Sequence, residues 1–299
     1  MITTMKGSYS IKELCAALGV SRSGYHAACA RPVAPRLAAN AKLLAHMQAI
    51  HSHRHTRCYG SPRMTKELRA TGSSCSVNRV ARVMRNAGLR VRARSPYRPK
   101  TTQVDHAAAP SPNLLAQADP AQKPGTHLVS DITYIPTKEG WLYLAVVIDL
   151  FSRAILGWSV AESLHATLVT DALGRAMDSG QVERGALFHS DRGSQYSAAP
   201  TRTCLARYGL RQSMSAKGCC YDNAFAESCF ASLKSELLDE GQPFISKPAA
   251  RTALFDYLAC FYNRKRLHSS LGYLSPKNFL LLPFQSQPTH LNSMPLGNS

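Results

Sequence analysis

Hydrophobic residues in the first part of the chain recur with the period of an α-helix. Over residues 10–25, Ser10 and Glu13 have the spacing of a capping box, Gly19 follows the first apolar stripe, and Ser21 is placed to cap a second helix. This pattern predicts a helix-turn-helix. A short helical pair is a common motif, so the pattern alone assigns it no role.

A clearer helical pair is expected over residues 59–94. Ser61 is placed to cap its first helix, with Pro62 at the first helical position, and Ser76 to cap a second helix that ends at Gly88. The second helix has an apolar face and an arginine face, which suits docking on DNA or, alternatively, a solvated basic surface. The apolar face comprises Val80, Val83, Met84 and Ala87, and the candidate DNA-binding residues are Arg79, Arg82, Arg85, Arg90, Arg92 and Arg94.

The composition changes after residue 100. Residues 101–124 are rich in Ala, Pro and Gln without a clear period, which is typical of a linker. We therefore predict a basic helix-turn-helix region over residues 1–100, this linker, a catalytic core over residues 125–282 and a C-terminal tail over residues 283–299.

The pattern beyond the linker alternates between strands and helices. The expected strands are 127–136, 141–149, 154–160 and 186–190, followed by a short segment at 210–214, and the expected helices are 165–178, 198–208, 222–239 and 248–262. The short break at residues 150–153 predicts a hairpin. This order is typical of an α/β fold in which an antiparallel hairpin joins parallel strands.

Positive charge is concentrated in the first third of the chain. Residues 1–110 hold 19 Lys and Arg against 3 Asp and Glu, whereas residues 111–299 hold 17 against 15. Lys and Arg displace counterions from phosphates, so the asymmetry predicts a DNA partner. No apolar run approaches the roughly 18 residues that span a membrane, and the start has no signal-peptide pattern. We therefore expect a cytoplasmic protein without a membrane partner.

The cysteine pattern argues against a structural zinc site. Nine cysteines are present and none forms a C-x-x-C pair, so we predict reduced thiols and no zinc. His51, His53 and His55 resemble a metal-binding tract. Because no cysteine stands at zinc spacing from them, a basic loop is the favoured interpretation.

Three carboxylates are placed where a catalytic metal site needs them. Asp131 lies inside the first expected strand, Asp191 ends the fourth, and Glu227 lies in a following helix. A carboxylate in an apolar strand needs a partner, and a cation is the least costly one. Mg²⁺, for which Mn²⁺ can substitute, prefers oxygen ligands, and two such ions roughly 4 Å apart support phosphoryl transfer. The three residues are the candidate catalytic and metal-binding set.

Other polar residues have weaker claims to a role. Lys234 follows Glu227 by two helical turns, shares its face and is a candidate DNA contact. Asp149 is either an accessory acid or a hairpin-turn acceptor, and His189 either assists proton transfer or is structural. Ser194, Gln195 and Tyr196 are candidates for DNA contact or helix capping, and Arg264, Arg266 and His268 for a basic patch that meets phosphate or is solvated.

The sequence resembles the second-frame (OrfB) product of the IS-three family of bacterial insertion-sequence transposases. The resemblance covers about residues 9–281. In the core it is carried by SDITYIPTKEGWLYLAVVIDLFSRAILGWS, HSDRGSQY, SMSAKGCCYDNAFAES, LKSEL and YNRKRLHSSLGYLSP, and in the helix-turn-helix segment by YGSPRM and VNRVARVMRNAGL. That family is similar to retroviral integrases and has an RNase H-like core with two aspartates and, after a 35-residue gap, a glutamate.

The resemblance implies roles for individual residues and partners. Asp131, Asp191 and Glu227 would be the catalytic triad, and Lys234 the basic residue of the triad helix. It also implies an RNase H-like core behind an all-α DNA-binding region, a homo-oligomer on DNA, a circular DNA intermediate and a first-frame (OrfA) partner. The chain has His127 where the family often has Trp and Cys219 where it often has Asn. Neither change removes a triad residue.

We therefore expect a metal-dependent DNA transposase that cleaves a strand and transfers the new 3′-hydroxyl end to another phosphodiester. Two alternatives stay open at this point: a nuclease of the same fold that only hydrolyses, and a non-catalytic DNA-binding regulator. Joined DNA products would distinguish the first, and metal-independent binding without cleavage would favour the second.

Overall fold

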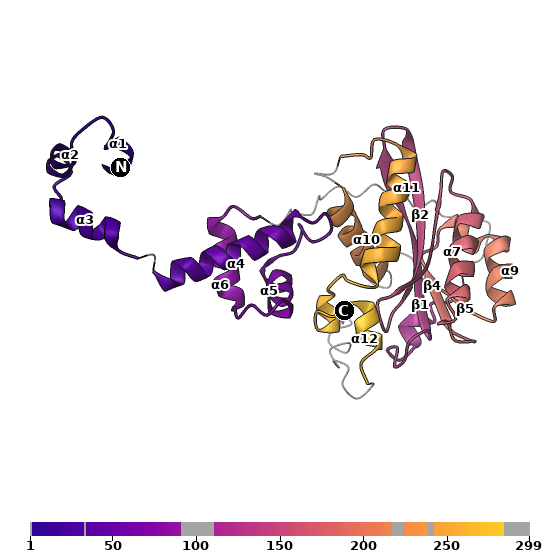
Figure 1. The fold of residues 1–299 in the computed structure, drawn as a ribbon. Coiled ribbons are helices and arrows are strands. Elements are labelled where there is room, and N and C mark those ends of the chain that lie inside the picture. The colour runs from indigo at the N-terminus through magenta and orange to yellow at the C-terminus, as the bar shows by residue number, and fades with distance from the viewer. Residues whose placement is uncertain (1, 33, 91–110, 217–223, 239–241, 284–299) are drawn as a thin grey trace. The chain divides into compact units, whose positions relative to one another are not determined.

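The chain forms two compact units in a computed structural model that describes residues 2–32, 34–90, 111–216, 224–238 and 242–283. The units are Met1–Ala49 and Ile50–Ser299 (Figure 1). The division falls well before the expected linker at residues 101–124, so the second helical pair belongs to the same unit as the sheet.

The first unit consists of short helices. They are α1 (Ile2–Met5), α2 (Ile11–Ala17), α3 (Arg22–Ala30) and the first part of α4 (Pro35–Ser52). The predicted capping box is confirmed, because the Glu13 N–H donates to Ser10 Oγ while the Glu13 carboxylate accepts from the Ser10 N–H. Gly19 adopts a positive φ of 64° just after α2, where it lets the chain turn into α3.

The second helical pair is α5 (Ser61–Ala70) and α6 (Val77–Asn86). Ser76 caps α6 as predicted, accepting from the Arg79 N–H. The predicted cap of α5 is wrong by one residue: Gly60 is the N-cap, and the Ser61 carbonyl instead accepts a hydrogen bond from the Thr65 hydroxyl inside the helix.

A five-stranded sheet of order β3-β2-β1-β4-β5 forms the centre of the second unit. The strands are β1 (His127–Thr137), β2 (Gly140–Asp149), β3 (Ile155–Ala161), β4 (Leu187–Ser190) and β5 (Arg211–Met214). Strands β1, β2 and β3 pair antiparallel, and β4 and β5 continue the sheet in parallel with β1. The predicted α/β class and the β2–β3 hairpin are therefore confirmed.

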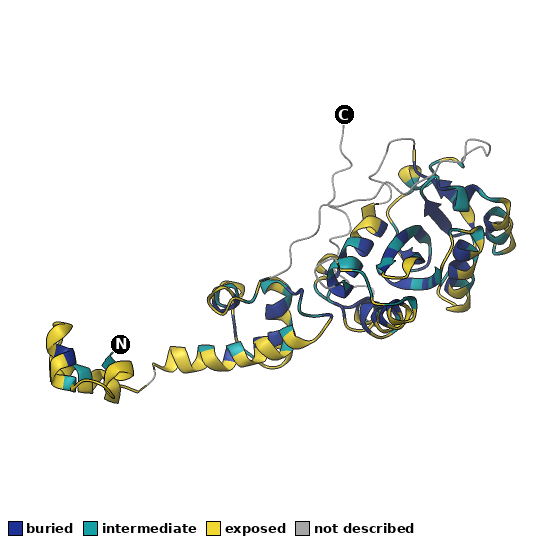
Figure 2. Ribbon diagram, turned by 90° about the horizontal axis from the view of Figure 1, so that it is seen from above, coloured by how far each residue is buried: buried dark blue, intermediate teal, exposed yellow. Residues whose placement is uncertain are grey.

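Helices cover both faces of this sheet (Figure 1). One face packs against α7 (Ala166–Asp178) and α9 (Ala199–Arg207) through Leu128, Val147 and Phe188. The other packs against α10 (Ala224–Leu237) and α11 (Lys247–Phe255). Buried residues gather where the helices meet the sheet (Figure 2). The alternation of side chains along β1 decides which residue faces which helix layer.

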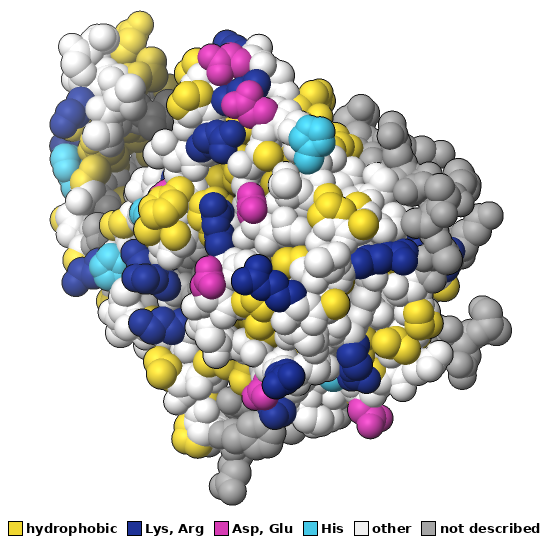
Figure 3. All heavy atoms as spheres, turned by 90° about the vertical axis from the view of Figure 1, so that its right-hand side faces the viewer, with side chains coloured by type: hydrophobic (Ala, Val, Ile, Leu, Met, Phe, Trp, Pro, Cys, Tyr) yellow, Lys and Arg dark blue, Asp and Glu magenta, His cyan; other side chains and the backbone are white. Residues whose placement is uncertain are grey.

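The face of the unit that carries α7 and α9 bears both basic and acidic side chains (Figure 3). On the side that carries α7 and α9, the Lys and Arg side chains drawn in Figure 3 are scattered singly among a few acids, rather than gathered into one patch. This scatter agrees with the nearly balanced charge of residues 111–299.

Shorter elements complete the unit. They are η1 (Leu115–Gln117), α8 (Ser194–Ser197), the π-helical turn η3 (Asp256–Tyr262), η4 (Ser269–Leu271) and α12 (Pro276–Leu280). The single helix expected over residues 248–262 is thus an α-helix that changes into a π-helix. Part of the expected linker is attached to the sheet: Leu115 N–H donates to Ser213 Oγ, and Met214 N–H to the Pro112 carbonyl, beside β5.

Candidate active site

Asp131 and Asp191 lie side by side at one edge of the parallel pair β1 and β4. The register pairs Leu128 with Phe188 and Val129 with His189. Asp131 lies two residues beyond this pairing in β1, and Asp191, two residues beyond it in the other segment, directly follows β4. Adjacent strands are roughly 4.8 Å apart. Leu128 and Phe188 face α7 and α9. The two aspartates, three residues further along each strand, therefore face the α10 layer.

The main chain orients both carboxylates. Asp131 Oδ1 accepts from the Ile132 N–H at 2.8 Å, and Asp191 Oδ1 accepts from the Gly193 N–H at 2.9 Å. A Cβ at Gly193 would lie 3.0 Å from Asp191 Oδ1, so a larger residue at this turn would have to displace the carboxylate slightly. Both aspartates are half-buried, which strengthens their electrostatic interactions relative to bulk water.

Tyr196 lies beneath the aspartate pair, in a buried position that suits neither DNA contact nor helix capping. Its ring is buried in the α7 layer, and its hydroxyl lies 3.0 Å from Ser130 Oγ. Burial, reinforced by the negative charges of Asp131 and then Asp191, raises the pKa of Tyr196 well above its ordinary value. The Tyr196 hydroxyl therefore lies within electrostatic range of both the Asp131 and the Asp191 carboxylate.

His189 has the structural role that was one of its two predicted uses. The ring is fully buried, with Nδ1 2.8 Å from Ser213 Oγ and Nε2 3.2 Å from Ser215 Oγ. It therefore ties β4 to β5. Asp149 likewise is a hairpin-turn acceptor: its fully buried carboxylate accepts from the N–H groups of Gly125 and Ser152.

Helix α10 carries Glu227 in its exposed first turn and Lys234 in its last turn. Burial lowers the pKa of Lys234, and the negative charge of Asp131 opposes that shift. Asp131 also acts electrostatically on the buried Cys229 thiol, so α10 crosses β1 close to this aspartate. The structure thereby brings Lys234 towards the acidic edge.

Glu227 remains a prediction as the third metal ligand beside the two aspartates. Within the described parts of the chain, no three His, Cys, Asp or Glu side chains form a group that could hold a metal ion. Residues 217–223, directly before α10, lie outside those parts. The paired oxygen donors of Asp131 and Asp191 nevertheless suit a hard divalent cation, which commonly takes one or two protein carboxylates and completes its shell with phosphate and water.

The basic patch expected at Arg264, Arg266 and His268 is wrong for two of its members. Arg264 is exposed, but Arg266 and His268 are buried. Arg266 forms an ion pair with the buried carboxylate of Glu236, its Nη2 lying 2.8 Å from Glu236 Oε1. The sequence pattern did not reveal this acid, because it lies 30 residues earlier in the chain.

The histidine tract divides between surface and core. His53 is exposed, whereas His55 is buried and its Nε2 lies 2.7 Å from Asp256 Oδ2. His55 packs on Tyr257 and Phe261 of η3. It therefore links the segment before α5 to the C-terminal helical layer rather than forming a basic loop.

Three of the six candidate DNA-binding arginines on and after α6 are exposed. Arg82, Arg85 and Arg90 are exposed and Arg79 is half-buried, while Val80, Val83 and Met84 are buried on the opposite side. Ala87, expected on the apolar face, is exposed at the helix end. Arg92 and Arg94 lie outside the described residues.

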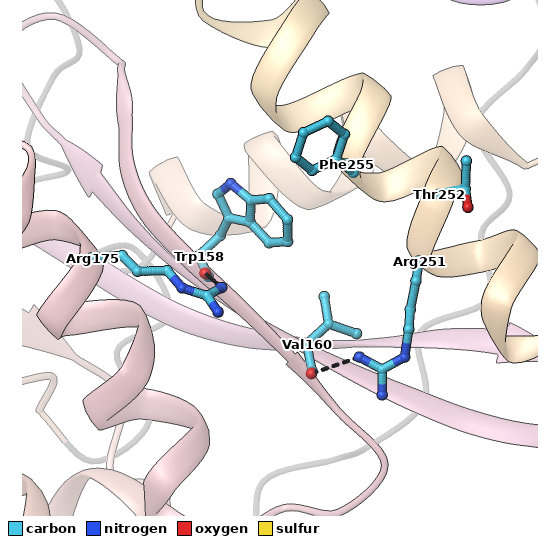
Figure 4. Close-up of a pocket in the computed structure, with 6 residues that line it drawn as sticks. All are labelled: Trp158, Val160, Arg175, Arg251, Thr252 and Phe255. Atoms are coloured by element: carbon cyan, nitrogen blue, oxygen red, sulfur yellow. Dashed lines mark hydrogen bonds between the residues drawn. The ribbon is translucent and has the colours of Figure 1, made fainter.

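A surface hollow that the sequence did not indicate lies along the outer edge of β3. It has a volume of about 410 Å³ and is lined by Trp158, Val160, Arg175, Arg251, Thr252 and Phe255 (Figure 4). Arg175 donates to the Trp158 carbonyl at 2.6 Å and Arg251 to the Val160 carbonyl at 3.0 Å. Two helices from opposite faces thus cap the exposed strand edge, which protects it from pairing with another strand.

Comparison with known proteins gives the class. Residues 121–220 match one integrase core domain family and residues 208–276 a second family of the same description, while residues 38–97 match an HTH-like domain family. Together with the mixed sheet and its aspartate edge, these matches define an RNase H-like polynucleotidyl transferase of the integrase class preceded by a helix-turn-helix-type region.

Two relatives narrow the class to a family. The chain is 44% identical over 277 residues to the transposase InsF for insertion sequence IS3A of Escherichia coli (strain K12), covering 92% of this chain and 95% of that protein. It is 40% identical over 227 residues to the transposase for insertion sequence element IS904 of Lactococcus lactis subsp. lactis (strain IL1403), covering 76% of this chain and 89% of the relative. The chain belongs to the IS3 family of insertion-sequence transposases.

Among solved structures, the chain is similar to a chain of a simian T-cell lymphotropic virus intasome bound to PP2A regulatory subunit B56 gamma. The TM-score is 0.45 at 13% identity, covering 81% of this chain and 77% of the other. No helix among the described residues is long and apolar enough to cross a membrane.

Proposed function

We propose that Asp131, Asp191 and Glu227 form the catalytic acid triad of this transposase, and that Asp131 and Asp191 are the fixed pair to which Glu227 is added. The observation that supports the proposal is the strand register, which leads β1 and β4 in parallel towards two half-buried carboxylates, Asp131 and Asp191. Repulsion between neighbouring carboxylates is relieved by a bound cation.

The three acids would hold Mg²⁺, with Mn²⁺ as a substitute. When bound, the metal supplies charge neutralisation for the attacking and leaving oxygens of a phosphodiester. The protein's own contribution is to orient the oxygens: the backbone N–H groups of Ile132 and Gly193 fix the two aspartates before DNA arrives.

Lys234 would bind a phosphate of the DNA end next to the aspartate edge. Burial lowers the pKa of Lys234, whereas the negative charge of Asp131 raises it, and a bound phosphate would raise it further. The 3′-hydroxyl freed from one strand then attacks another phosphodiester directly, so that one P–O bond forms as another breaks and the proton passes to solvent.

The helical pair α5–α6 would dock on the ends of the element. The exposed arginines of α6 lie opposite its buried face, in the arrangement of a helix that contacts phosphates and a groove. Joining two DNA ends needs more than one active site, so we infer a homo-oligomer on DNA, and an OrfA product as an additional partner in the cytoplasm.

The test compares the wild-type chain with Asp191→Asn on labelled duplexes that carry the element ends, with Mg²⁺ or Mn²⁺. The amide oxygen of the asparagine still accepts from the Gly193 N–H, so the turn is kept while the charge is removed. We expect joined strands from the wild type only, with equal DNA binding by both proteins. Nicks without joining would favour a nuclease, and bound DNA without products in any wild-type reaction would favour a regulator.

A further inference from the structure

Glu236 is a buried carboxylate on the triad helix that the proposed chemistry does not use. It lies on α10, nine residues after Glu227, and its side chain is 2% exposed. Arg266 Nε donates to Oε2 at 2.9 Å and Nη2 donates to Oε1 at 2.8 Å, while the Tyr257 hydroxyl donates to Oε2 at 2.7 Å. Two short sequence words, LKSEL and YNRKRLHSSLGYLSP, thus meet at one buried ion pair.

The Glu236–Arg266 ion pair is not explained by its contribution to folding stability. A buried ion pair loses solvation on both partners, and well-packed apolar side chains of similar size often replace it without destabilising the fold. The pair is distinguished by its directionality, because the planar guanidinium donates two hydrogen bonds to the carboxylate and thereby fixes their relative orientation. Helix α10 packs against the sheet layer through apolar residues that include Phe230, Leu233 and Leu237, and apolar burial is less directional than a hydrogen-bonded ion pair.

The segment before and within α5 holds the same end of α10. Cys58 donates its thiol hydrogen to the Ser235 carbonyl at 3.0 Å, and Arg54 Nη2 reaches the Leu237 carbonyl at 3.5 Å. Arg63 of α5 lies 3.7 Å from Glu236 Oε1. The carboxyl end of α10 is therefore held both by the C-terminal helical layer and by the helical pair that carries the DNA-facing arginines.

We infer that Glu236 is a positioning residue, which through Arg266 and Arg63 sets the rotation and height of α10 and thereby places Glu227 and Lys234 at the Asp131–Asp191 edge. The inference rests on the proposed function, in which Glu227 and Lys234 act at that edge. Because Arg63 of α5 contacts Glu236 of α10, DNA that binds the helical pair would also influence the position of the triad helix.

The test uses the full-length chain and two kinds of variant. In the first, Glu236→Met, Arg266→Met and Tyr257→Phe are combined, so that the core stays filled and no buried polar group of the three is left without its partner. In the second, Arg266→Lys keeps the charge but not the planar fork. Glu162→Gln, in the exposed Glu162–Lys247 pair, is the control. Thermal midpoint, affinity for element-end DNA and single-turnover strand-transfer rate are measured for each.

We expect both variants to fold and to bind DNA within about twofold of wild type, and to transfer strands about a hundredfold more slowly, the order expected for an ångström-scale misplacement. The control keeps the wild-type rate. A wild-type rate in the folded triple variant or in Arg266→Lys would overturn the inference, as would a decrease in rate fully matched by a decrease in DNA affinity. Glu227→Gln, measured in parallel, distinguishes failure of the proposed function from failure of this inference. If Glu227→Gln stays active, the proposed function is wrong. If Glu227→Gln is inactive while the triple variant and Arg266→Lys are fully active, only this inference is wrong.

Discussion

Asp131 and Asp191 are positioned by the main chain, whereas Lys234 and Glu236 are positioned by the packing of a helix. The N–H groups that hold the aspartates belong to a strand and to the tight turn after β4, both of which are fixed by the sheet. The acidic edge is therefore set before DNA binds, and small changes in that turn should affect catalysis more than folding.

Gly193→Ala tests this at the turn after β4. The added Cβ would lie 3.0 Å from Asp191 Oδ1 and 3.2 Å from Gln195 Oε1, so the carboxylate has to shift. We expect the strand-transfer rate to fall by about 10- to 100-fold, while the free energy of unfolding changes by about 1 kcal/mol. Strand transfer at the wild-type rate would show that this turn does not set the aspartate.

His268 makes stability depend on pH. Burial, followed by the positive charges of Arg266, Arg63 and Arg153, lowers the pKa of His268 well below its usual value. The unfolded chain then binds this proton at a higher pH than the folded chain. The stability that the neutral ring supplies is complete above pH about 6.5 and is lost as the pH falls below that value.

We therefore expect the thermal midpoint to fall between pH about 7.5 and about 5. His268→Gln, which cannot titrate, should show a smaller fall over the same range. The comparison is made by circular dichroism at constant ionic strength. Equal falls in both proteins would mean that other groups dominate the pH dependence.

At the scale of elements, α6 has a buried apolar face and an exposed basic face. Val80, Val83 and Met84 attach it to the unit, while Arg82 and Arg85 are exposed and take no part in that packing. Arg82→Gln with Arg85→Gln should leave the thermal midpoint unchanged and weaken DNA binding. The slope of log affinity against log salt should fall by about 0.9 for each phosphate that the protein no longer neutralises. An unchanged slope would place the DNA elsewhere on the molecule.

The contact between β3 and α7 depends on a residue without a side chain. A Cβ at Gly157 would lie 2.1 Å from the Ala172 carbonyl oxygen and 2.5 Å from the Ala176 backbone nitrogen, so the helix would have to move away from the sheet. Gly157→Ala should cost about 3 kcal/mol of unfolding free energy. Chemical denaturation checks this, with Gly174→Ala, where the Cβ meets only the Tyr208 hydroxyl at 3.9 Å, as the control.

At the scale of the whole molecule, the second helical pair belongs with the catalytic core. Tyr59 is fully buried in the α10 and α11 layer, and its hydroxyl accepts from the Leu267 N–H. The predicted division into a basic DNA-binding region over residues 1–100 and a catalytic core over residues 125–282 remains a prediction. The structure adds that Tyr59 packs in the core and that His55 packs on Tyr257 and Phe261, so removing the residues before the linker would expose apolar surface.

A fragment of residues 50–283 should therefore be more stable than one of residues 111–283. Removing Tyr59 alone takes away a large buried side chain, which costs about 3–5 kcal/mol. We expect the shorter fragment to melt roughly 10 °C lower. Calorimetry of the two fragments measures this, and equal midpoints would show that the core is complete without the helical pair.

Local patterns determined most of the elements and pointed to Asp131 and Asp191 as candidates. The β1–β3 meander, helices α7 and α9, the capping box at Ser10 and the Ser76 cap follow from side-chain period and short-range hydrogen bonding, which act within a few residues. Asp131 and Asp191 were recognisable because a charged residue in or just after an apolar strand has few structural uses.

Tertiary structure alone decided the partners of polar groups that are far apart in the chain. Glu236 with Arg266, His55 with Asp256, and Arg175 and Arg251 on the β3 edge are separated by tens to hundreds of residues or come from different helices. Periodicity predicts which face of an element is buried. It does not distinguish an arginine that is buried in an ion pair from one that is exposed to water. Which of them pairs is decided by three-dimensional packing, since ion pairs and hydrogen bonds act over a few ångströms whatever the separation in sequence.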